Sequence, residues 1–519
     1  MSETAGWLVV WPVVIPILAA ALAAAAWGNE KAQSRIGVVG LCAQLVAAIV
    51  LFIHVWSHGV VAMSMGGWQA PFGIALAADA LGAGLTMVGS FVGLIVALHS
   101  LGSTSPEQRR AGFFPLFLAL MAGVAGAFLT SDIFNLYVWF EVTLISSFGL
   151  IVLGGGREQI DGAVKYAFLN LIATTLLLIA IGLLYGLTGT LNMADLSGKV
   201  ALLAQDSTLE TIGLLFLVSL GMKAALFPLY FWLPAAYHTP LPTVSAIFAA
   251  LLTKVGVYSL IRVFTLVFPE SADMAREAMI YLAVATMVIG ALGALAETDI
   301  RRFVSFTVMS GVGVMVGGLA IGSELAFVGT IFYFIHSIII SAALFIAAGM
   351  ISDAGKTTKI EALAGLYKKA PYLAVTFLIV GLSLAGIPPL AGFWPKVYLV
   401  QAGLEAGSPL LVVGILLSGF LSLVAVGRAF CLIFWRDSED QAAAPKAVPL
   451  VNGSMGAFAA ITVVIGLFSA PMVDLSSRSA AQLLQPGPYI ETVLGAPQAA
   501  VADEEPAAAL IGFETEVVQ

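Results

Sequence analysis

The sequence has very little charge. Only 10% of its 519 residues are Asp, Glu, Lys or Arg, whereas 60% are hydrophobic. A soluble globular protein carries about 25% charged residues, so this balance excludes an ordinary soluble domain. Long apolar runs recur from near the N-terminus to about residue 474, and such runs are typical of helices that cross a bilayer. The sequence therefore predicts an all-α, polytopic membrane protein.

The sequence also lacks the patterns of common cofactor and metal sites. Its two cysteines, Cys42 and Cys431, lie in apolar runs without the spacing of a metal or redox motif. No glycine-rich phosphate loop, Walker lysine or dinucleotide fingerprint occurs, so ATP hydrolysis and hydride transfer have no support. The net charge of −8 reflects polar loops and an acidic tail. We therefore predict no enzyme activity, no bound cofactor, no metal and no nucleic-acid partner.

About 14 spans are predicted, because a helix of roughly 20 apolar residues crosses the hydrocarbon core. The first apolar run follows no basic region and has no clean cleavage site, so it is expected to be a retained helix. The transmembrane domain is expected to cover 1–475, with a flexible, acidic, extracytoplasmic tail over 476–519. The expected spans are 6–27, 37–57, 79–100, 113–130, 133–154, 164–187, 211–232, 245–267, 277–296, 302–321, 325–350, 371–400, 410–435 and 454–473.

Basic residues are unevenly shared between the two sides of these spans. With the N-terminus outside, the inner loops hold fourteen Lys and Arg residues and the outer side holds three. Cytoplasmic loops carry an excess of Lys and Arg, so both termini are expected to be extracytoplasmic. The inner set is Lys31, Arg35, Arg109, Arg110, Arg157, Lys165, Arg301, Arg302, Lys356, Lys359, Lys368, Lys369, Arg436 and Lys446, and the outer set is Lys199, Arg276 and Arg478.

Several ionisable residues fall inside spans. Lys223 and Lys254 lie midway along spans 7 and 8, and Lys396 follows the prolines of span 12. Glu141 lies near the middle of span 5, and His336 lies deep in span 11. A charge at a helix centre costs about 2.5–3.5 kcal/mol, so such groups face a protein interior or a wet cavity. A lysine held between burial and a carboxylate can change protonation when its partner moves, as a proton relay requires.

A purely structural role stays open for each of these buried ionisable residues taken singly. One buried lysine could be a structural ion-pair partner, and one buried histidine could be a satisfied core residue. Arg262 and Arg428 lie about two turns from a span end, which favours a structural or snorkelling role for each.

Prolines interrupt two of the charged spans. Pro228 and Pro234 break span 7 beside its lysine, and Pro388, Pro389 and Pro395 break span 12. Open backbone at membrane depth is tolerated only where it is buried in protein or lines a cavity. Broken helices in corresponding places of two halves indicate an ion path in secondary transporters.

The two broken spans are five apart, which predicts an internal repeat. Spans 4–8, about 113–267, and spans 9–13, about 277–435, could be two five-helix units. Since five is odd, the second unit would insert with the opposite topology. The alternative is that these prolines only kink packed helices.

Four stretches resemble the antiporter-like proton-translocating subunits of Mrp-type Na+/H+ antiporters, respiratory complex I and membrane-bound hydrogenases. They are "SDIFNLYVWFEVTLISS", "GMKAALFPLYFWLPAAYHTPLPTVSAIFAALLTKVGVYSLIR", "ETDIRRFVSFTVMSGVGV" and "LAGIPPLAGFWPKVYLV". The resemblance covers nearly the whole chain. It is greatest to the D-type subunits of the Mrp complexes, because two further stretches resemble those subunits more than their complex I relatives. These stretches are "KYAFLNLIATTLLLIAIGLLYGLTGTLNMADLS" and "FGIALAADALGAGL".

The resemblance implies a proton path. Glu141 would pair with and modulate Lys223, and Lys254 would be the connecting lysine of span 8. His336 would lie on the central polar axis, and Lys396 would lie near the exit to one side.

Further polar residues are expected to assist. His238 matches a histidine found in the span 7–8 turn of some members, and Thr253, Ser146 and Ser147 could order water. The sequence departs from the pattern at Ser341, where many of the D-type sequences have lysine; serine can pass a proton through water but cannot hold a positive charge.

The resemblance thus implies a proton-translocating subunit of a multisubunit Na+/H+ antiporter, driven by the proton motive force, in a bacterial inner membrane. Its partners would be the other subunits of a hetero-oligomer, with protons and Na+ as the transported ions. One alternative is a proton-pumping subunit of complex I or of a membrane-bound hydrogenase. The other is a membrane scaffold that conducts nothing.

Overall fold

The computed structural model describes residues 3–203, 207–269, 273–437 and 448–495. The first helices are α1 (Glu3–Ala25), α2 (Glu30–His58), α3 (Ala80–Ser103), α4 (Pro106–Gln108), α5 (Phe114–Leu129), α6 (Ile133–Ile151), α7 (Arg157–Thr188), α8 (Met193–Leu202), α9 (Ser207–Ala224), α10 (Trp232–Ala236) and α11 (Pro242–Ile247). They are followed by α12 (Thr253–Arg262), α13 (Asp273–Ala296), α14 (Ile300–Ile321), α15 (Glu324–Gly355), α16 (Leu366–Lys369), α17 (Pro371–Ala385), α18 (Phe393–Glu405), α19 (Pro409–Phe430), α20 (Pro449–Leu467), α21 (Ala470–Leu484) and α22 (Gly487–Leu494).

Short non-α segments connect or extend these helices. A hairpin of β1 (Val61–Ser64) and β2 (Ala75–Ala78) pairs antiparallel, with Val61 opposite Ala78. π-Helical turns at Phe248–Leu252 and Val263–Val267 flank α12. The remaining segments are 3₁₀ turns at Met65–Gly67, Val152–Gly154 and Ile360–Ala362 and π turns at Arg109–Phe113 and Cys431–Trp435.

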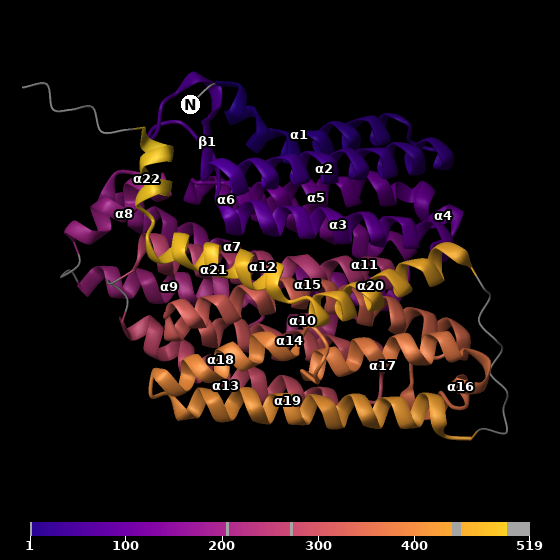
Figure 1. Cartoon of the computed structure of the whole chain (residues 1–519). Coiled ribbons are helices and arrows are strands. Elements are labelled where there is room, and N and C mark those ends of the chain that lie inside the picture. Colours follow the sequence, from indigo (N-terminus) through magenta and orange to yellow (C-terminus); the bar gives the residue numbers. More distant parts are fainter. Residues whose placement is uncertain (1–2, 204–206, 270–272, 438–447, 496–519) are drawn as a thin grey trace, which may run out of the picture.

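Most long helices lie side by side along one common direction (Figure 1). Among the described residues, thirteen helices are long and apolar enough to cross a membrane, and α17 is a shorter apolar helix. This confirms a polytopic helical membrane protein. The total of about 14 spans and the inverted repeat remain predictions.

Polar side chains at the first turn fix where several helices begin. The carboxylate of Asp79 accepts a hydrogen bond from the amide of Gly82 at 2.8 Å, and Asp132 caps α6 through the amide of Asn135 at 2.7 Å. Ser323 caps α15 in the same way. Each cap satisfies an amide that has no partner inside its helix, which matters most where the helix end is buried.

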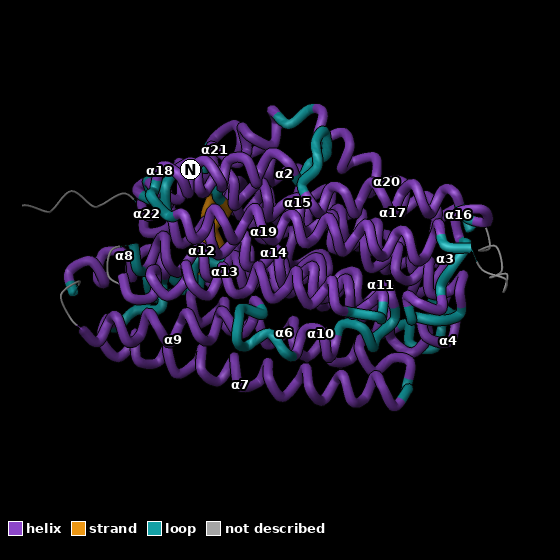
Figure 2. The backbone as a smooth tube through the Cα atoms, turned by 90° about the horizontal axis from the view of Figure 1, so that it is seen from below, coloured by secondary structure: helices purple, strands orange, loops and turns teal. Residues whose placement is uncertain are grey.

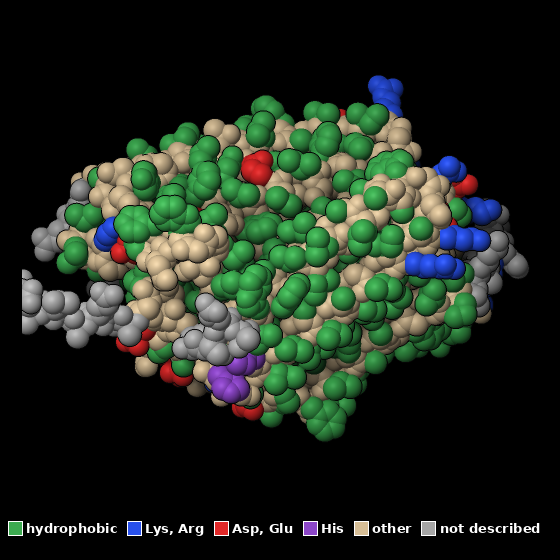
Figure 3. Space-filling model, turned by 90° about the horizontal axis from the view of Figure 1, so that it is seen from above, with side chains coloured by type: hydrophobic (Ala, Val, Ile, Leu, Met, Phe, Trp, Pro, Cys, Tyr) green, Lys and Arg blue, Asp and Glu red, His purple; other side chains and the backbone are tan. Residues whose placement is uncertain are grey.

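The centre of the bundle is formed by α15 and by the span Pro242–Val267, whose apolar stretches are buried along their whole length. Helices such as α7, α13 and α19 instead expose much of their apolar surface. In Figure 3 hydrophobic side chains cover the visible face, while Lys and Arg gather at one end. This arrangement places α12 and α15, which carry Lys254 and His336, away from any surrounding lipid.

The expected span 371–400 is two helices, α17 and α18, separated by a turn. The expected span 211–232 likewise stops at Ala224, where α9 ends. Loop segments therefore lie midway along the bundle beside α10, as well as at its ends (Figure 2). The two proline-rich breaks predicted from the sequence are present.

The prediction of a loose tail over 476–519 is wrong as far as Leu494. Residues 470–484 and 487–494 form α21 and α22, and Leu475, Leu483 and Tyr489 are buried. These helices are amphipathic rather than uniformly apolar, so a search for long apolar runs passes over them. Residues 496–519 lie outside the described residues.

Candidate functional site

The two breaks share one backbone design. At the first, the amide of Leu226 bonds back to the carbonyl of Gly221 at 2.8 Å; at the second, the amide of Ile387 bonds to that of Leu382 at 3.1 Å. Each bond spans five residues and closes the end of its helix, in the pattern of a Schellman cap.

The residue before each of these amides is left-handed, with φ of 66° at Ala225 and 89° at Gly386. A cis peptide bond to proline then follows in both breaks, and proline is the third residue of the next helix, as Pro234 in α10 and Pro395 in α18. The two breaks therefore correspond residue by residue, with Leu226 equivalent to Ile387 and Pro228 equivalent to Pro389.

The two lysines reach equivalent helix ends from opposite sides. Lys223 lies in the last turn of α9, just before its break. Lys396 lies after its break, and its Nζ donates to the carbonyls of Leu384 and Ala385 at 3.1 and 2.8 Å, at the end of α17. The C-terminal end of a helix favours a cation, so each broken helix supplies a site for a lysine charge.

Glu141 and Lys223 do not form the direct ion pair that the resemblance implies, within the described part of the chain. Nζ of Lys223 lies 5.3 Å from the ring centre of Phe140, and Oε1 of Glu141 is buried without a hydrogen-bond partner. The Glu141 carboxylate still acts on Lys223 electrostatically. The two groups are thus neighbours held apart, and an aromatic ring contacts the cation.

Lys254 lies in the middle of the protein with no exposed surface. Its Nζ donates to the carbonyl of Ala249 at 2.7 Å and to Oγ of Ser341, on α15, at 3.0 Å. Ala249 belongs to the π-helical turn before α12, and such turns leave carbonyls free for other donors. Ser341, where relatives were expected to have lysine, is therefore the side-chain partner of Lys254.

His336 is 2% exposed, and neither ring nitrogen has a hydrogen-bond partner among the described residues. Lys254 and Lys396 are both near enough to act on it electrostatically. A Cβ at Gly392 in the second break would come 2.9 Å from Nε2. The histidine therefore contacts the break directly, with its hydrogen-bonding capacity unused.

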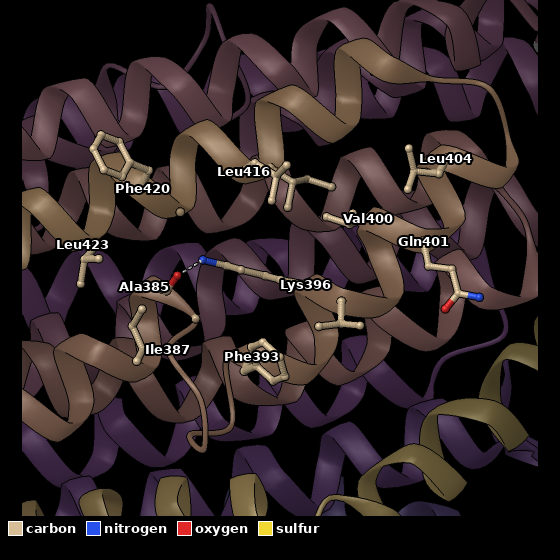
Figure 4. A pocket seen from close by; sticks show the side chains of 14 residues that line it. Ala385, Ile387, Phe393, Lys396, Val400, Gln401, Leu404, Leu416, Phe420 and Leu423 are labelled. Carbon is tan, nitrogen blue, oxygen red and sulfur yellow. Dashed lines mark hydrogen bonds between the residues drawn. The ribbon is translucent and has the colours of Figure 1, made fainter.

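Lys396 lines a pocket of about 450 Å³ formed by α18, α19 and the end of α17. Figure 4 shows its amine pointing to the carbonyl of Ala385, with apolar side chains such as Phe393, Leu416 and Phe420 around the cavity. A Cβ at Gly386 would lie 2.8 Å from Cδ of Lys396, so glycine leaves room for the lysine.

We expect Gly386→Ala to destabilise the second break by about 1–2 kcal/mol, the cost of a left-handed residue that carries a Cβ, and to displace Lys396. Thermal unfolding of the purified protein would measure the first effect, and a structure of the variant would show the second. Ala225→Gly is the matched control, because Ala225 already bears that cost and should gain stability. Equal stability changes of one sign would contradict the equivalence of the breaks.

The three accessory hydroxyl residues differ in whether the hydroxyl has a hydrogen-bond partner. Oγ1 of Thr253 is buried without a partner in the described residues, whereas Ser146 donates to the carbonyl of Val142 at 2.7 Å. Oγ of Ser147 lies 2.7 Å from the hydroxyl of Tyr166. Only Thr253, of the three, has an unused hydroxyl.

His238 lies in the turn before α11, where its Nδ1 donates to the carbonyl of Pro234 at 2.8 Å. Burial lowers its pKa below the usual value because it disfavours the imidazolium. Its position between α10 and α11 joins the first break to the helix that leads to Lys254.

Arg262 and Arg428 have the structural roles that the sequence favoured. Arg262 pairs with Asp79 at 2.8 Å, with both side chains at most 5% exposed. Arg428 donates to the carbonyl of Leu295 at 2.5 Å, near the end of α13. The partner Asp79 was not selected from the sequence, because it lies far from Arg262 along the chain.

No group of three or more His, Cys, Asp or Glu side chains that could hold a metal occurs within 3–203, 207–269, 273–437 and 448–495. The site is a row of basic groups in the buried interior of the protein, beside interrupted helices. Such a row can hold or pass protons.

Comparisons with known proteins agree with this geometry. The family described as "NADH:quinone oxidoreductase/Mrp antiporter, TM" matches residues 130–422. The chain belongs to this family. The match begins just before α6, which carries Glu141, and ends within α19, so it includes both breaks and every basic residue of the row.

Relatives extend the similarity over nearly the full length. The chain is 40% identical over 471 residues to the D subunit of the Na+/H+ antiporter of Alkalihalophilus pseudofirmus, covering 90% of this chain and 94% of the relative. It is 38% identical over 495 residues to the protein of the same name from Bacillus subtilis, covering 94% and 99%. These matches confirm the resemblance drawn from the sequence motifs.

Solved structures share the fold. A chain of the Mrp complex from Dietzia sp. DQ12-45-1b superposes with a TM-score of 0.88 at 29% identity, covering 95% of this chain and 100% of that one. A chain of an archaeal membrane-bound sulfane sulfur reductase gives 0.87 at 26%, with the same coverage. Respiratory complex I from Thermus thermophilus gives 0.80 at 24% identity, covering 92% and 99%, and at that identity shows the fold alone.

Proposed function

We propose that this protein is a proton-translocating subunit of a multisubunit Na+/H+ antiporter, a secondary transporter driven by the proton motive force. The observation that carries the proposal is the buried row of Lys223, Lys254, His336 and Lys396 beside two matched helix breaks. The names of the two relatives, which are both D subunits of Na+/H+ antiporters, support the assignment to an antiporter rather than to a redox pump.

Each residue of the row has a role that follows from its contacts. Lys223 holds a charge at the end of α9, and Glu141 tunes that charge from a short distance. Lys254 passes a proton toward His336, whose free nitrogens can accept and release it. Lys396 receives it at the end of α17, beside the pocket of Figure 4.

Proton transfer between these residues requires water, because most of their side chains do not contact one another. The interrupted backbone at each break leaves carbonyls that can hold such water inside the protein. Thr253, with its unused hydroxyl, lies next to Lys254 in the chain and could order one of these waters. Ser146, Ser147 and His238 are the remaining accessory groups in this proposal.

The proposal extends to location and assembly. The protein would lie in a bacterial inner membrane with both termini outside, as the distribution of basic loops predicts. It would act with the other subunits of the antiporter and would itself carry no cofactor or enzyme activity. The two matched breaks support an inverted repeat of spans 4–8 and 9–13.

Antiport in membrane vesicles from an antiporter-deficient host tests the proposal. The complete set of subunits would be compared with a set lacking this one and with Lys223→Ala and Glu141→Ala. We expect Lys223→Ala to abolish antiport and Glu141→Ala to reduce it, with normal assembly. Lys199→Ala is the matched control, because the Lys199 side chain is exposed and pairs with Asp195 one turn away on the same helix. Unchanged antiport with Lys223→Ala in an assembled complex would favour the scaffold alternative.

A further inference from the structure

Two threonines that the proposed proton path does not use lie against the two breaks. Thr286 of α13 is fully buried; its Oγ1 accepts a hydrogen bond from the amide of Phe227 at 2.9 Å and donates to the carbonyl of Leu282 at 2.5 Å. Phe227 lies inside the first break, immediately before Pro228. A side chain from a neighbouring helix thus holds an amide that the break has released.

Thr462 of α20 has the corresponding place at the second break. It is 1% exposed, and its carbonyl accepts a hydrogen bond from the amide of Ala391 at 3.3 Å. The helix comes so close that a Cβ at Gly466 would overlap the carbonyl oxygen of Pro389. The hydroxyl of Thr462, however, has no hydrogen-bond partner in the described part of the chain.

The sequence around the two threonines supports their equivalence. Thr286 begins "TMVIG" and Thr462 begins "TVVIG". In the predicted numbering of spans, α13 is span 9 and α20 is span 14, five apart like the two broken spans. The same spacing of five spans therefore separates the two breaks and the two helices that pack against them.

One residue explains why the two hydroxyls differ. The position that corresponds to Phe227 is Pro388, because Pro228 is equivalent to Pro389. Proline has no amide hydrogen to donate. Thr286 therefore has a backbone donor to hold, and Thr462 does not.

We propose that Thr286 and Thr462 are positioning residues of the proton path, Thr286 as a clamp that keeps the first break closed and Thr462 as a free hydroxyl that lets water enter the second break. The amide of Ala391 donates a hydrogen bond to the carbonyl of Thr462, and the next residue, Gly392, contacts His336. In this proposal the Thr462 hydroxyl and the nitrogens of His336, which have no partner among the described residues, are the polar groups that bind the water. This inference rests on the proposed function of the row of basic groups.

The threonines are tested in the complete complex by replacing each with valine, which keeps the shape and removes the hydroxyl, and with serine, which keeps the hydroxyl. We expect Thr286→Val to speed deuterium exchange of the amide of Phe227 by about tenfold, since one hydrogen bond is lost. We expect Thr462→Val to leave exchange at Ala391 unchanged but to lower antiport severalfold. Serine should restore wild-type behaviour at both positions.

A double substitution tests the explanation from Pro388. Pro388→Ala supplies an amide that Thr462 can hold, so antiport should fall as the second break becomes clamped. Pro388→Ala combined with Thr462→Val should be no worse than Thr462→Val alone, because the clamp needs both partners. Independent, multiplying effects would overturn the proposal, as would full antiport from an assembled Thr462→Val complex.

The outcomes separate this inference from the proposed function. If Lys223→Ala had no effect on antiport, the proposed function would fail, while exchange at Phe227 would still report on the Thr286 clamp. If Thr286→Val did not assemble, the Thr462 and Pro388 variants, which remove no side-chain hydrogen bond seen in the structure, would still decide the issue.

Discussion

Lys254→Met is expected to lower proton-driven antiport by about 100-fold, the lower end of what a positioned proton-transfer group contributes to its step. Lys254 is fully buried and its amine donates to Ser341 of α15, a place that no other basic group of the row occupies. Methionine has a similar length and no charge to bury, so the surrounding core should stay packed. The measurement is antiport in vesicles, normalised to the amount of assembled complex.

Lys254→Arg distinguishes a relay from a fixed structural cation. Arginine keeps the positive charge but does not release its proton in a protein. A relay requires release, so Lys254→Arg should be about as inactive as Lys254→Met. Substantial antiport from the arginine variant would contradict the relay. Ser341→Ala, which removes only one hydrogen bond to Nζ, should have a much smaller effect.

The ionisable groups of the site could be predicted because their sequence signal is local. A charge in a long apolar run is costly wherever the helix packs, and a proline breaks a helix from its own position in the chain. For this reason Lys223, Lys254, Lys396 and His336 could be selected without a structure. Each helix break and the lysine beside it can likewise be predicted from one short stretch of sequence.

Contacts between distant segments could not be predicted in the same way. Thr286 is an ordinary residue of an apolar helix until the amide of Phe227 is seen beside it. The side-chain partner of Lys254 could be suspected only because Ser341 departs from the expected lysine. The direct pair of Glu141 with Lys223 was expected from resemblance, but in the structure the Lys223 amine lies against the ring of Phe140 instead.

We expect a large loss of stability when the buried ion pair of Asp79 with Arg262 is broken. Arg262→Met should destabilise the protein by about 3–5 kcal/mol, because it leaves the carboxylate of Asp79 buried without its cation. Asp79 would keep its bond from the amide of Gly82 but lose its cation, and the ring of Tyr489, 5.1 Å from the guanidinium, would lose its contact. Thermal unfolding of the purified complex, together with the yield of assembled protein, would measure the loss.

Asp79→Leu combined with Arg262→Met should recover most of that stability, because the double variant removes both buried charges and replaces them with apolar groups of similar size. Such a recovery of stability is expected when an ion pair has only a structural role, and antiport should recover with it. The basic row behaves differently, since among the described residues Lys254 has no carboxylate partner whose removal could compensate for its loss. If the double variant regained stability but not antiport, Asp79 or Arg262 would belong to the path as well as to the scaffold. If it regained neither, tyrosine contacts rather than the ion pair would hold α22 and α12 together at this end of the bundle.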